Sequence, residues 1–531
     1  MKKIYLLITA LILICNTSAR AQEDQRLTEV FRNAYSVYEH LRASTGMYQA
    51  KLDLVNNNSL ANASIAVNGM ALVTVCVADQ MGWIDNGQDL VIETLESLSG
   101  QTAGFTPDRN PSGFYPHFFN KNTGARAGGT SEYSSVDNAV FCAGMKFCKN
   151  YFQNHSKGAA IAALVDELWS GYDWSHVVVD PATDSNGGGM YLATDDTGAG
   201  SGNITRPYNE YILVAWMAYN HEKETEASGP AHRLWNNWFE NTANLYKVAY
   251  AGYDMLTVKR KVYQAEHTYQ MPYYLCHFYT TNQGDASGDK GYLHYMLNTV
   301  MADRAWFQAN TTGASYEWAM SAGSGIDKES GDLTKGYYSV DAIDDNPYHI
   351  VSPHTMAAFM PVYPQSKHDL IALFENNKGV YGLPWDRSKK IIWRYSLREP
   401  SWEAPKVQGV DYAPFIFGVA SLPEYCGPDF FARNNDIFDS GFLPNAINDL
   451  VKREQLMVAP NPAQDYFTIQ GMDQNIQRVE IYDVTGKQVL QLEETALLSD
   501  RIPVGALNPG IYMVKATFQS GDQMSCKLIK H

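Results

Sequence analysis

The chain lacks several motifs that would assign it to a common enzyme class. It contains seven cysteines in 531 residues, none of them in a C-x-x-C pair. A zinc ribbon or a thioredoxin-type site is therefore not expected. Neither G-x-S-x-G nor H-E-x-x-H occurs, which leaves esterase and zinc peptidase functions without support.

Positive charge is also scarce. Lys and Arg number 41 against 57 Asp and Glu, giving a net charge of −16. Such a surface is a poor partner for nucleic acid or anionic membranes. It also disfavours a polyanionic glycan, whereas neutral glycans remain possible substrates or ligands. Aromatic residues make up 12% of the chain, and Tyr and Trp can stack on sugar faces or fill the core.

Residues 1–21 have the pattern of a secretory signal peptide. Lys2 and Lys3 precede an apolar run over 5–14, and Ala19-Arg20-Ala21 forms a small-x-small cleavage site. The run is too short to span a bilayer, and no later stretch is apolar enough to do so. We expect a protein exported through the periplasm that ends secreted or at the cell surface.

Amphipathic helical patterns fill residues 22–445. This number of helices fits a mainly α fold of six helical hairpins closed into an (α/α) toroid, and no period of a solenoid repeat is visible. Long loops separate several helices, as is common where a binding site is built on a rigid scaffold. We expect about twelve helices, at 24–44, 61–82, 86–99, 134–154, 157–172, 207–221, 229–250, 267–281, 289–310, 352–363, 366–377 and 409–421.

A linker at 446–457 precedes a segment with a different pattern. Residues 458–531 alternate between apolar and polar positions and are broken by TGK, NPG and SGD turns. This pattern predicts a small antiparallel β-sandwich.

Two acidic residues are predicted at the starts of apolar helices. Asp137 follows Ser134 and Ser135, either of which can cap the helix, and it benefits from the helix dipole. Glu210 lies in the cluster Arg206–Tyr211 before another apolar helix. Two such carboxylates facing one cavity would suit glycoside hydrolysis, in which one protonates the leaving oxygen and the other activates water or attacks the sugar. Asp137 could instead serve only to cap its helix.

Two further clusters contain side chains that could contact a sugar. Trp318 stands in a loop, and residues 341–354 hold three aspartates, among them Asp344, together with His349 and His354. The aspartates do not have the spacing of an EF-hand, so a solvated turn with one functional aspartate is favoured over a calcium site.

The C-terminal segment resembles the sorting domain of type IX secretion in Bacteroidetes. The resemblance rests on four motifs in order: Ala459–Pro462, Ile481–Lys487, Leu507–Tyr512 and Lys527–Lys530. It implies that the type IX secretion machinery is a partner and that this domain has no catalytic role.

A set of motifs follows in order through residues 26–435: Met81–Ile84, Gly113–Phe118, Ser134–Ala139, Tyr208–Glu210, Trp318–Ala322, Ile350–Ala358 and Gly379–Leu383. With these motifs, the segment resembles the glucoamylase-like family that includes bacterial endo-β-1,2-glucanases. The resemblance implies an inverting hydrolase of a neutral β-glucan, with β-1,2-glucan the expected substrate. It implies no metal and no organic cofactor, and we expect a monomer without a membrane span.

Carried over by position, the resemblance makes Glu210 the general acid and Asp137 a second carboxylate of the site, either the base or its orienter. Tyr133 stands where the related glucanases have a further acid, so the base and the linkage stay open. The substrate-binding residues that we predict are His117, Tyr133, Tyr208, Trp318, Asp344 and His354.

Two other functions are compatible with the sequence. A polysaccharide lyase on the same toroid would need cations to neutralise a uronic acid, and only Arg126 and Arg206 lie near the candidate clusters. A non-catalytic glycan-binding protein that feeds an importer is the other alternative, and Tyr133 is the best argument for it.

Overall fold

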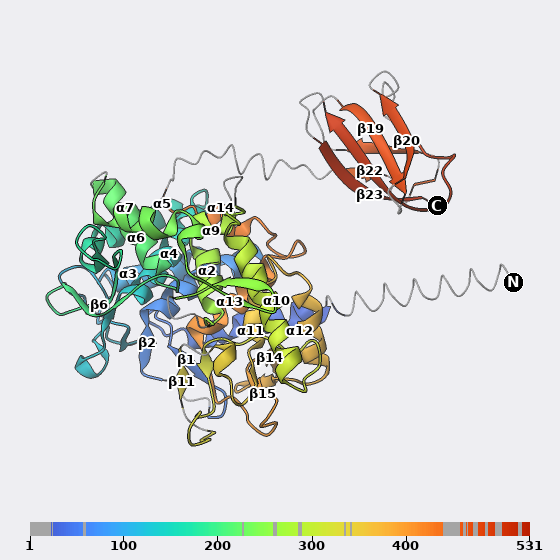
Figure 1. The fold of residues 1–531 in the computed structure, drawn as a ribbon. Coiled ribbons are helices and arrows are strands. Elements are labelled where there is room, and N and C mark those ends of the chain that lie inside the picture. Colours follow the sequence, from blue (N-terminus) through green and yellow to red (C-terminus); the bar gives the residue numbers. More distant parts are fainter. Residues whose placement is uncertain are drawn as a thin grey trace. The chain divides into compact units, whose positions relative to one another are not determined.

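The protein consists of two compact units in a computed structural model, residues 1–438 and 439–531 (Figure 1). In the first unit the structure describes residues 23, 25–56, 60–225, 228–258, 263–284, 289–333, 336–339 and 342–438. In the second it describes 457–459, 463–464, 466–470, 476–483, 487–493, 502–518 and 523–530. The predicted signal peptide and almost all of the predicted linker lie outside these ranges.

The first unit is rich in helices, as the sequence predicts. A helix over residues 25–41 comes first. The others are α2 (Ile65–Gln80), α3 (Gly87–Leu98), α4 (Ser135–Phe152), α5 (Gly158–Ser170), α6 (Ile212–Thr225), α7 (Pro230–Leu234), α8 (His267–Leu275), α9 (His277–Thr281), α10 (Tyr292–Asn310), α11 (Pro353–Ala358), α12 (Ser366–Glu375), α13 (Gly409–Ala420) and α14 (Phe430–Asn434).

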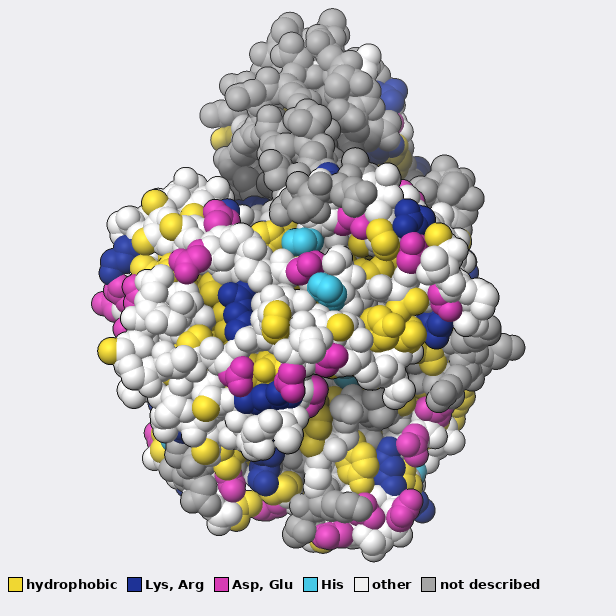
Figure 2. All heavy atoms as spheres, turned by 90° about the vertical axis from the view of Figure 1, so that its left-hand side faces the viewer, with side chains coloured by type: hydrophobic (Ala, Val, Ile, Leu, Met, Phe, Trp, Pro, Cys, Tyr) yellow, Lys and Arg dark blue, Asp and Glu magenta, His cyan; other side chains and the backbone are white. Residues whose placement is uncertain are grey.

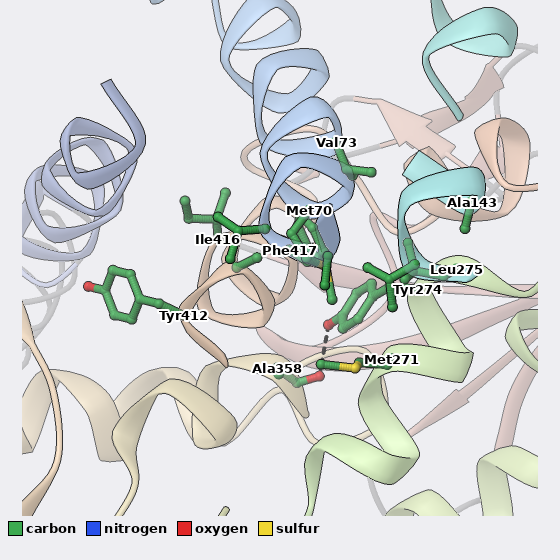
Figure 3. Packing of buried hydrophobic residues seen from close by; sticks show 14 of the residues in the cluster. Met70, Val73, Ala143, Met271, Tyr274, Leu275, Ala358, Tyr412, Ile416 and Phe417 are labelled. Carbon is green, nitrogen blue, oxygen red and sulfur yellow. Dashed lines mark hydrogen bonds between the residues drawn. The ribbon is translucent and has the colours of Figure 1, made fainter. Parts of the chain in front are cut away.

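Several of these helices are buried on almost every side, which explains why they are apolar around the whole circumference. Every residue from Ile65 to Ala78 in α2 is buried, and α13 is buried from Asp411 to Ala420. Figure 3 shows Met70 of α2, Tyr274 of α8 and Phe417 of α13 packed in one cluster. The hydroxyl of Tyr274 donates a hydrogen bond of 2.7 Å to the Ala358 carbonyl of α11.

Helices α2 and α4 touch backbone to backbone. A Cβ atom on Gly144 would lie 2.1 Å from the carbonyl oxygen of Gly69, and one on Gly69 would lie 2.5 Å from Phe141 Cα. Only glycine permits this approach, which fixes the middle of α4 against α2.

The segment expected to be one helix at 229–250 is divided. The short helix α7 continues into a π-helical turn at Trp235–Phe239, and β8 (Lys247–Tyr250) then pairs with β9 (Tyr253–Leu256). Asn236, Asn237, Asn241 and Asn244 favour turns over a continuous helix, because their side chains compete for backbone hydrogen bonds. The expected helix at 267–281 is likewise broken, between α8 and α9.

Short antiparallel strand pairs occur in the first unit, some between segments that are far apart in sequence and one between neighbouring segments. The pairs are β1 (Lys51–Asp53) with β16 (Lys406–Gln408), β2 (Asn62–Ser64) with β3 (Phe118–Asn120), β10 (Gly323–Ser324) with β11 (Tyr337–Tyr338), β12 (Ile350–Val351) with β15 (Tyr395–Ser396), and β13 (Val380–Leu383) with β14 (Asp386–Ile392). A further sheet contains β4 (Tyr133–Ser134), β5 (Val178–Val179), β6 (Gly189–Thr194) and β7 (Gly200–Thr205).

The second unit is built from antiparallel strands. One sheet has the order β20 (Gln488–Glu493), β19 (Ile476–Asp483), β22 (Gly510–Phe518), β23 (Gln523–Lys530), and the other has the order β17 (Met457–Ala459), β18 (Tyr466–Gln470), β21 (Ile502–Pro503). Phe467 of one sheet and Val479, Ile481 and Val514 of the other belong to one buried cluster. The β-sandwich of the second unit and the six-hairpin toroid of the first unit remain predictions.

Two surface properties bear on partners. Within the described residues, no helix is both long and apolar enough to cross a membrane. On the face drawn in Figure 2, acidic and basic side chains are intermixed instead of being separated by sign.

Candidate active site

Asp137 is held at the start of α4 by two neighbours. The Ser134 hydroxyl caps the helix by accepting a hydrogen bond of 3.4 Å from the Asp137 amide, and it also forms a short hydrogen bond to Asp137 Oδ2. The other carboxylate oxygen, Oδ1, lies 3.5 Å from His117 Nε2. Asp137 therefore caps its helix and still exposes 15% of its side chain, so the two roles weighed from the sequence are compatible.

His117 lies between two carboxylates. Its Nδ1 is 2.8 Å from Glu132 Oε1, on the side opposite Asp137. Burial lowers the pKa of His117, but Asp137 and Glu132 outweigh burial, and the pKa is raised overall. The hydrogen bond to His117 in turn lowers the pKa of Glu132. The two carboxylates therefore favour the positively charged form of His117 next to Asp137.

Glu210 lies in the turn that precedes α6, and the Leu213 amide donates to its carbonyl at 3.1 Å. Its side chain is 25% exposed, and Oε2 lies 4.0 Å from Nε2 of His267, the first residue of α8. Burial lowers the pKa of His267, so this imidazole is neutral at pH 7. Ser321 Oγ lies 3.1 Å from its Nδ1 and fixes the orientation of the ring.

Asp137 and Glu210 line one cavity of about 430 Å³. His117 and His267 belong to its wall, together with apolar side chains of α2, α4 and α8. The expectation that both acids face a common hollow thus agrees with where the structure places them.

A third carboxyl, Asp411 in the first turn of α13, lines the same cavity. Burial raises its pKa to about 7, while a hydrogen bond from Tyr337 and the charge of Arg394 limit the rise. The Tyr337 hydroxyl donates to Oδ1 at 3.3 Å. Oδ2 has no hydrogen-bond partner among the described residues. Asp411 is not among the site residues predicted from the sequence, although it lies at the start of an apolar helix, as Asp137 does.

Tyr337 lies close to all three acids. Although 44% of the residue is exposed, its hydroxyl is bonded to Asp411 beside the cavity. Loss of hydration at this hydroxyl, together with the charges of Asp411, Asp137 and Glu210, raises its pKa. The three carboxyls thus converge on one phenol in the part of the cavity wall contributed by β11.

Glu210 and His267 also line a second cavity, of about 630 Å³. Its other lining residues include Tyr211, Tyr263 and Asp344. Glu210 therefore stands at the junction of two hollows, with Asp137 and Asp411 in the first. Asp344, predicted as a substrate contact, lies in the second, where Oδ2 accepts a hydrogen bond of 3.4 Å from the Tyr263 amide.

Three residues predicted to touch substrate are instead buried in the core. Tyr208 is fully buried and donates to the Thr268 carbonyl at 2.6 Å. Trp318 donates through Nε1 to Asp369 at 2.8 Å. His354 packs on Trp393, with ring centroids 4.4 Å apart. Because each is at most 1% exposed, none offers a face to a sugar in this structure.

Tyr133 is likewise buried, in β4, and lines neither of these two cavities. Its hydroxyl donates to Asp108 at 3.1 Å, and Arg126 lies over its ring.

Among the described residues, no three potential metal ligands come together.

The comparisons with known proteins agree with the division into two units. Residues 457–531 match the model of the secretion system C-terminal sorting domain. No curated protein matches the sequence.

Solved structures similar to this chain share its fold. An endo-β-1,2-glucanase from Chitinophaga pinensis, solved with sophorotriose and glucose, is 17% identical with a TM-score of 0.63, over 81% of this chain and 97% of that one. A β-1,2-glucanase from Parabacteroides distasonis is 14% identical with a TM-score of 0.61, over 79% and 60%. An endo-β-1,2-glucanase from Talaromyces funiculosus, solved with sophorose, is 10% identical with a TM-score of 0.55, over 81% and 88%.

Proposed function

We propose that this protein is a secreted glycoside hydrolase that cleaves a neutral β-glucan, with β-1,2-glucan as the substrate. The observation that carries the proposal is the convergence of Asp137, Glu210 and Asp411 on one cavity. The fold shared with three β-1,2-glucanases supports the linkage. The sorting domain supports export by the type IX machinery to the cell surface or beyond.

Glu210 is the general acid. It stands at the junction of the two cavities, so a glycan lying across both would bring a glycosidic oxygen to its carboxyl. In the bond-breaking step, Glu210 donates a proton to that oxygen as the bond to the anomeric carbon breaks. Burial lowers the pKa of its neighbour His267 and so makes this imidazole a weaker competitor for the proton.

Asp411 is the general base, and Asp137 positions the substrate. Both oxygens of Asp137 are already engaged by Ser134 and His117. Asp411 instead keeps Oδ2 without a partner among the described residues, so this oxygen can accept a proton from the attacking water. An inverting reaction requires this water between base and sugar, which sets the two carboxyls about 6.5–9.5 Å apart.

A lyase is the weaker alternative for this cavity. Elimination would require a cation beside the carboxylate of a uronic acid, next to the base. Lys51 lines this cavity, but the charge that acts on it is that of Lys406 and not that of any of the three acids. His117 is already held between Glu132 and Asp137. A lyase leaves an unsaturated bond that absorbs light. Products that lack this absorbance would agree with hydrolysis.

The test is a product assay on a panel of β-glucans that includes linear β-1,2-glucan. We expect short β-1,2-gluco-oligosaccharides that are released initially as the α-anomer. Glu210→Gln and Asp411→Ala should each lower kcat by roughly 10²–10⁴-fold. Azide should restore turnover to Asp411→Ala alone, because a small anion can replace the water that a missing base activates.

Substitution of Glu29, an exposed residue of the helix at 25–41, by Ala gives a matched control with unchanged turnover. Binding of β-1,2-glucan without any release of reducing ends would instead favour a non-catalytic glycan-binding protein. Full activity of Glu210→Gln would remove that residue from the mechanism.

A further inference from the structure

One end of the carboxylate cavity carries a lysine that the proposed mechanism does not use. Lys51 of β1 lines the cavity together with Gln408 of β16. In the antiparallel register, Lys51 lies opposite Gln408, and Asp53 lies opposite Lys406. Because side chains alternate along a strand, these four share one face of the ribbon, while Leu52 and Val407 between them are buried in the core.

The neighbours of Lys51 on this face are already engaged. The carboxylate of Asp53 accepts hydrogen bonds of 2.9 Å from the amides of Val55 and Asn56, and it interacts electrostatically with Lys406. The amide group of Gln408 donates to Ser324 Oγ at 3.0 Å and accepts from the Ser324 amide at 3.2 Å. Neither group is available to neutralise Lys51.

Lys51 itself has no ion-pair or hydrogen-bond partner for its ammonium among the described residues. It is half-buried, and burial together with the nearby Lys406 lowers its pKa. Burial and Lys406 therefore destabilise the positive charge of Lys51, and a bound anion would offset this destabilisation. Among the described residues that line this cavity, Lys51 is the one lysine or arginine.

Acidic side chains are found in the described lining of the second cavity. Asp344 and Asp345 line it, and the described residues contribute no Lys or Arg to its lining. A glycan lying across Glu210 would therefore pass Lys51, Asp137 and Asp411 in the first cavity, and Asp344 and Asp345 in the second. A negatively charged substituent is favoured next to Lys51 over a position next to these carboxylates.

We propose that the Lys51 end of the cavity binds an anionic substituent, a phosphate or a carboxylate, carried by a sugar residue of the β-glucan. This proposal rests on the proposed function, since it places the substituted residue on the Asp137 side of Glu210. Lys51 would donate charge-assisted hydrogen bonds to the anion, and Lys406 would add to its attraction.

The test compares three linear β-1,2-gluco-oligosaccharides of equal length: unmodified, phosphorylated at primary hydroxyls, and succinylated at the same hydroxyls. Equilibrium dissociation constants are measured on the full secreted chain carrying Glu210→Gln, so that cleavage cannot distort binding. The same ligands are then measured after adding Lys51→Gln. Lys406→Gln is the matched control, because Lys406 does not line the cavity.

We expect the anionic ligands to bind about ten-fold more tightly than the neutral one, as a charge-assisted hydrogen bond allows. Lys51→Gln should abolish this preference while changing neutral binding by less than two-fold, and Lys406→Gln should reduce it only slightly. A preference for phosphate over succinate, or the reverse, identifies the substituent.

Two results would overturn the proposal: equal binding of all three ligands, or an equal loss of all three in Lys51→Gln. Neither would affect the proposed hydrolysis of neutral β-1,2-glucan. Conversely, anion-selective binding without cleavage by the unsubstituted protein would contradict the proposed hydrolase while supporting this subsite.

Discussion

At Asp411, burial sets the protonation state that a general base requires. With a pKa of about 7, this carboxyl is protonated below neutrality and cannot accept a proton from water there. We therefore expect kcat/KM on β-1,2-glucan to fall as the pH drops below about 7. The hydrogen bond from Tyr337 lowers this pKa, so Tyr337→Phe should raise it.

The acidic limb of the pH profile should consequently move to higher pH in Tyr337→Phe, and activity should fall more at pH 6 than at pH 8. Tyr338→Phe is the matched control, because the Tyr338 hydroxyl bonds to Asp327 and not to Asp411. A limb that stays in place or moves to lower pH in Tyr337→Phe would contradict the assignment of this limb to Asp411.

Some residues of this site were predicted from patterns in the sequence. The predictions of Asp137, Glu210, His117 and Asp344 lead to residues that line the two cavities. Asp411 was not predicted, because its partner Tyr337 is 74 residues away in sequence and no local pattern links the two residues. Tyr208, Trp318 and His354 were assigned to substrate by motif alone, and a motif does not reveal which face of a side chain is covered.

At the scale of elements, the contact between α2 and α4 depends on two glycines. Gly144→Ala would place a Cβ atom against the Gly69 carbonyl, at 2.1 Å if nothing moved. The helices would have to separate, and we expect the free energy of unfolding to fall by about 1–3 kcal/mol or more. Thermal unfolding of the variant, compared with Glu29→Ala on an exposed helix face, measures this effect. An unchanged melting temperature would show that the helices can part freely.

Helices were predicted well where an apolar pattern continued over several turns, as in α2, α4 and α13. The prediction failed at 229–250, where aromatic residues at helical spacing concealed a π-helical turn and the start of a β-hairpin. Several of the short strand pairs were missed because they join segments that are distant in sequence. Residues 51–53, for instance, pair with 406–408.

At the scale of the whole molecule, the two units have separate buried cores. A chain truncated after residue 445 should therefore keep the melting temperature and kcat/KM of the full protein while failing to reach the cell surface. Differential scanning calorimetry and fractionation of cells that express both forms test this. Loss of activity in the purified truncated form would contradict the assignment of all chemistry to the first unit.

The pairing of β1 with β16 brings the beginning and the end of the first unit together. One cavity wall is thus assembled from Lys51, Asp137, Glu210 and Asp411. A growing polypeptide must emerge past α13 before that wall can close, so shorter nascent forms contain two of the three acids but no complete pocket. We therefore expect the chain to become catalytically competent only late in synthesis, and fragments that end before α13 to be inactive.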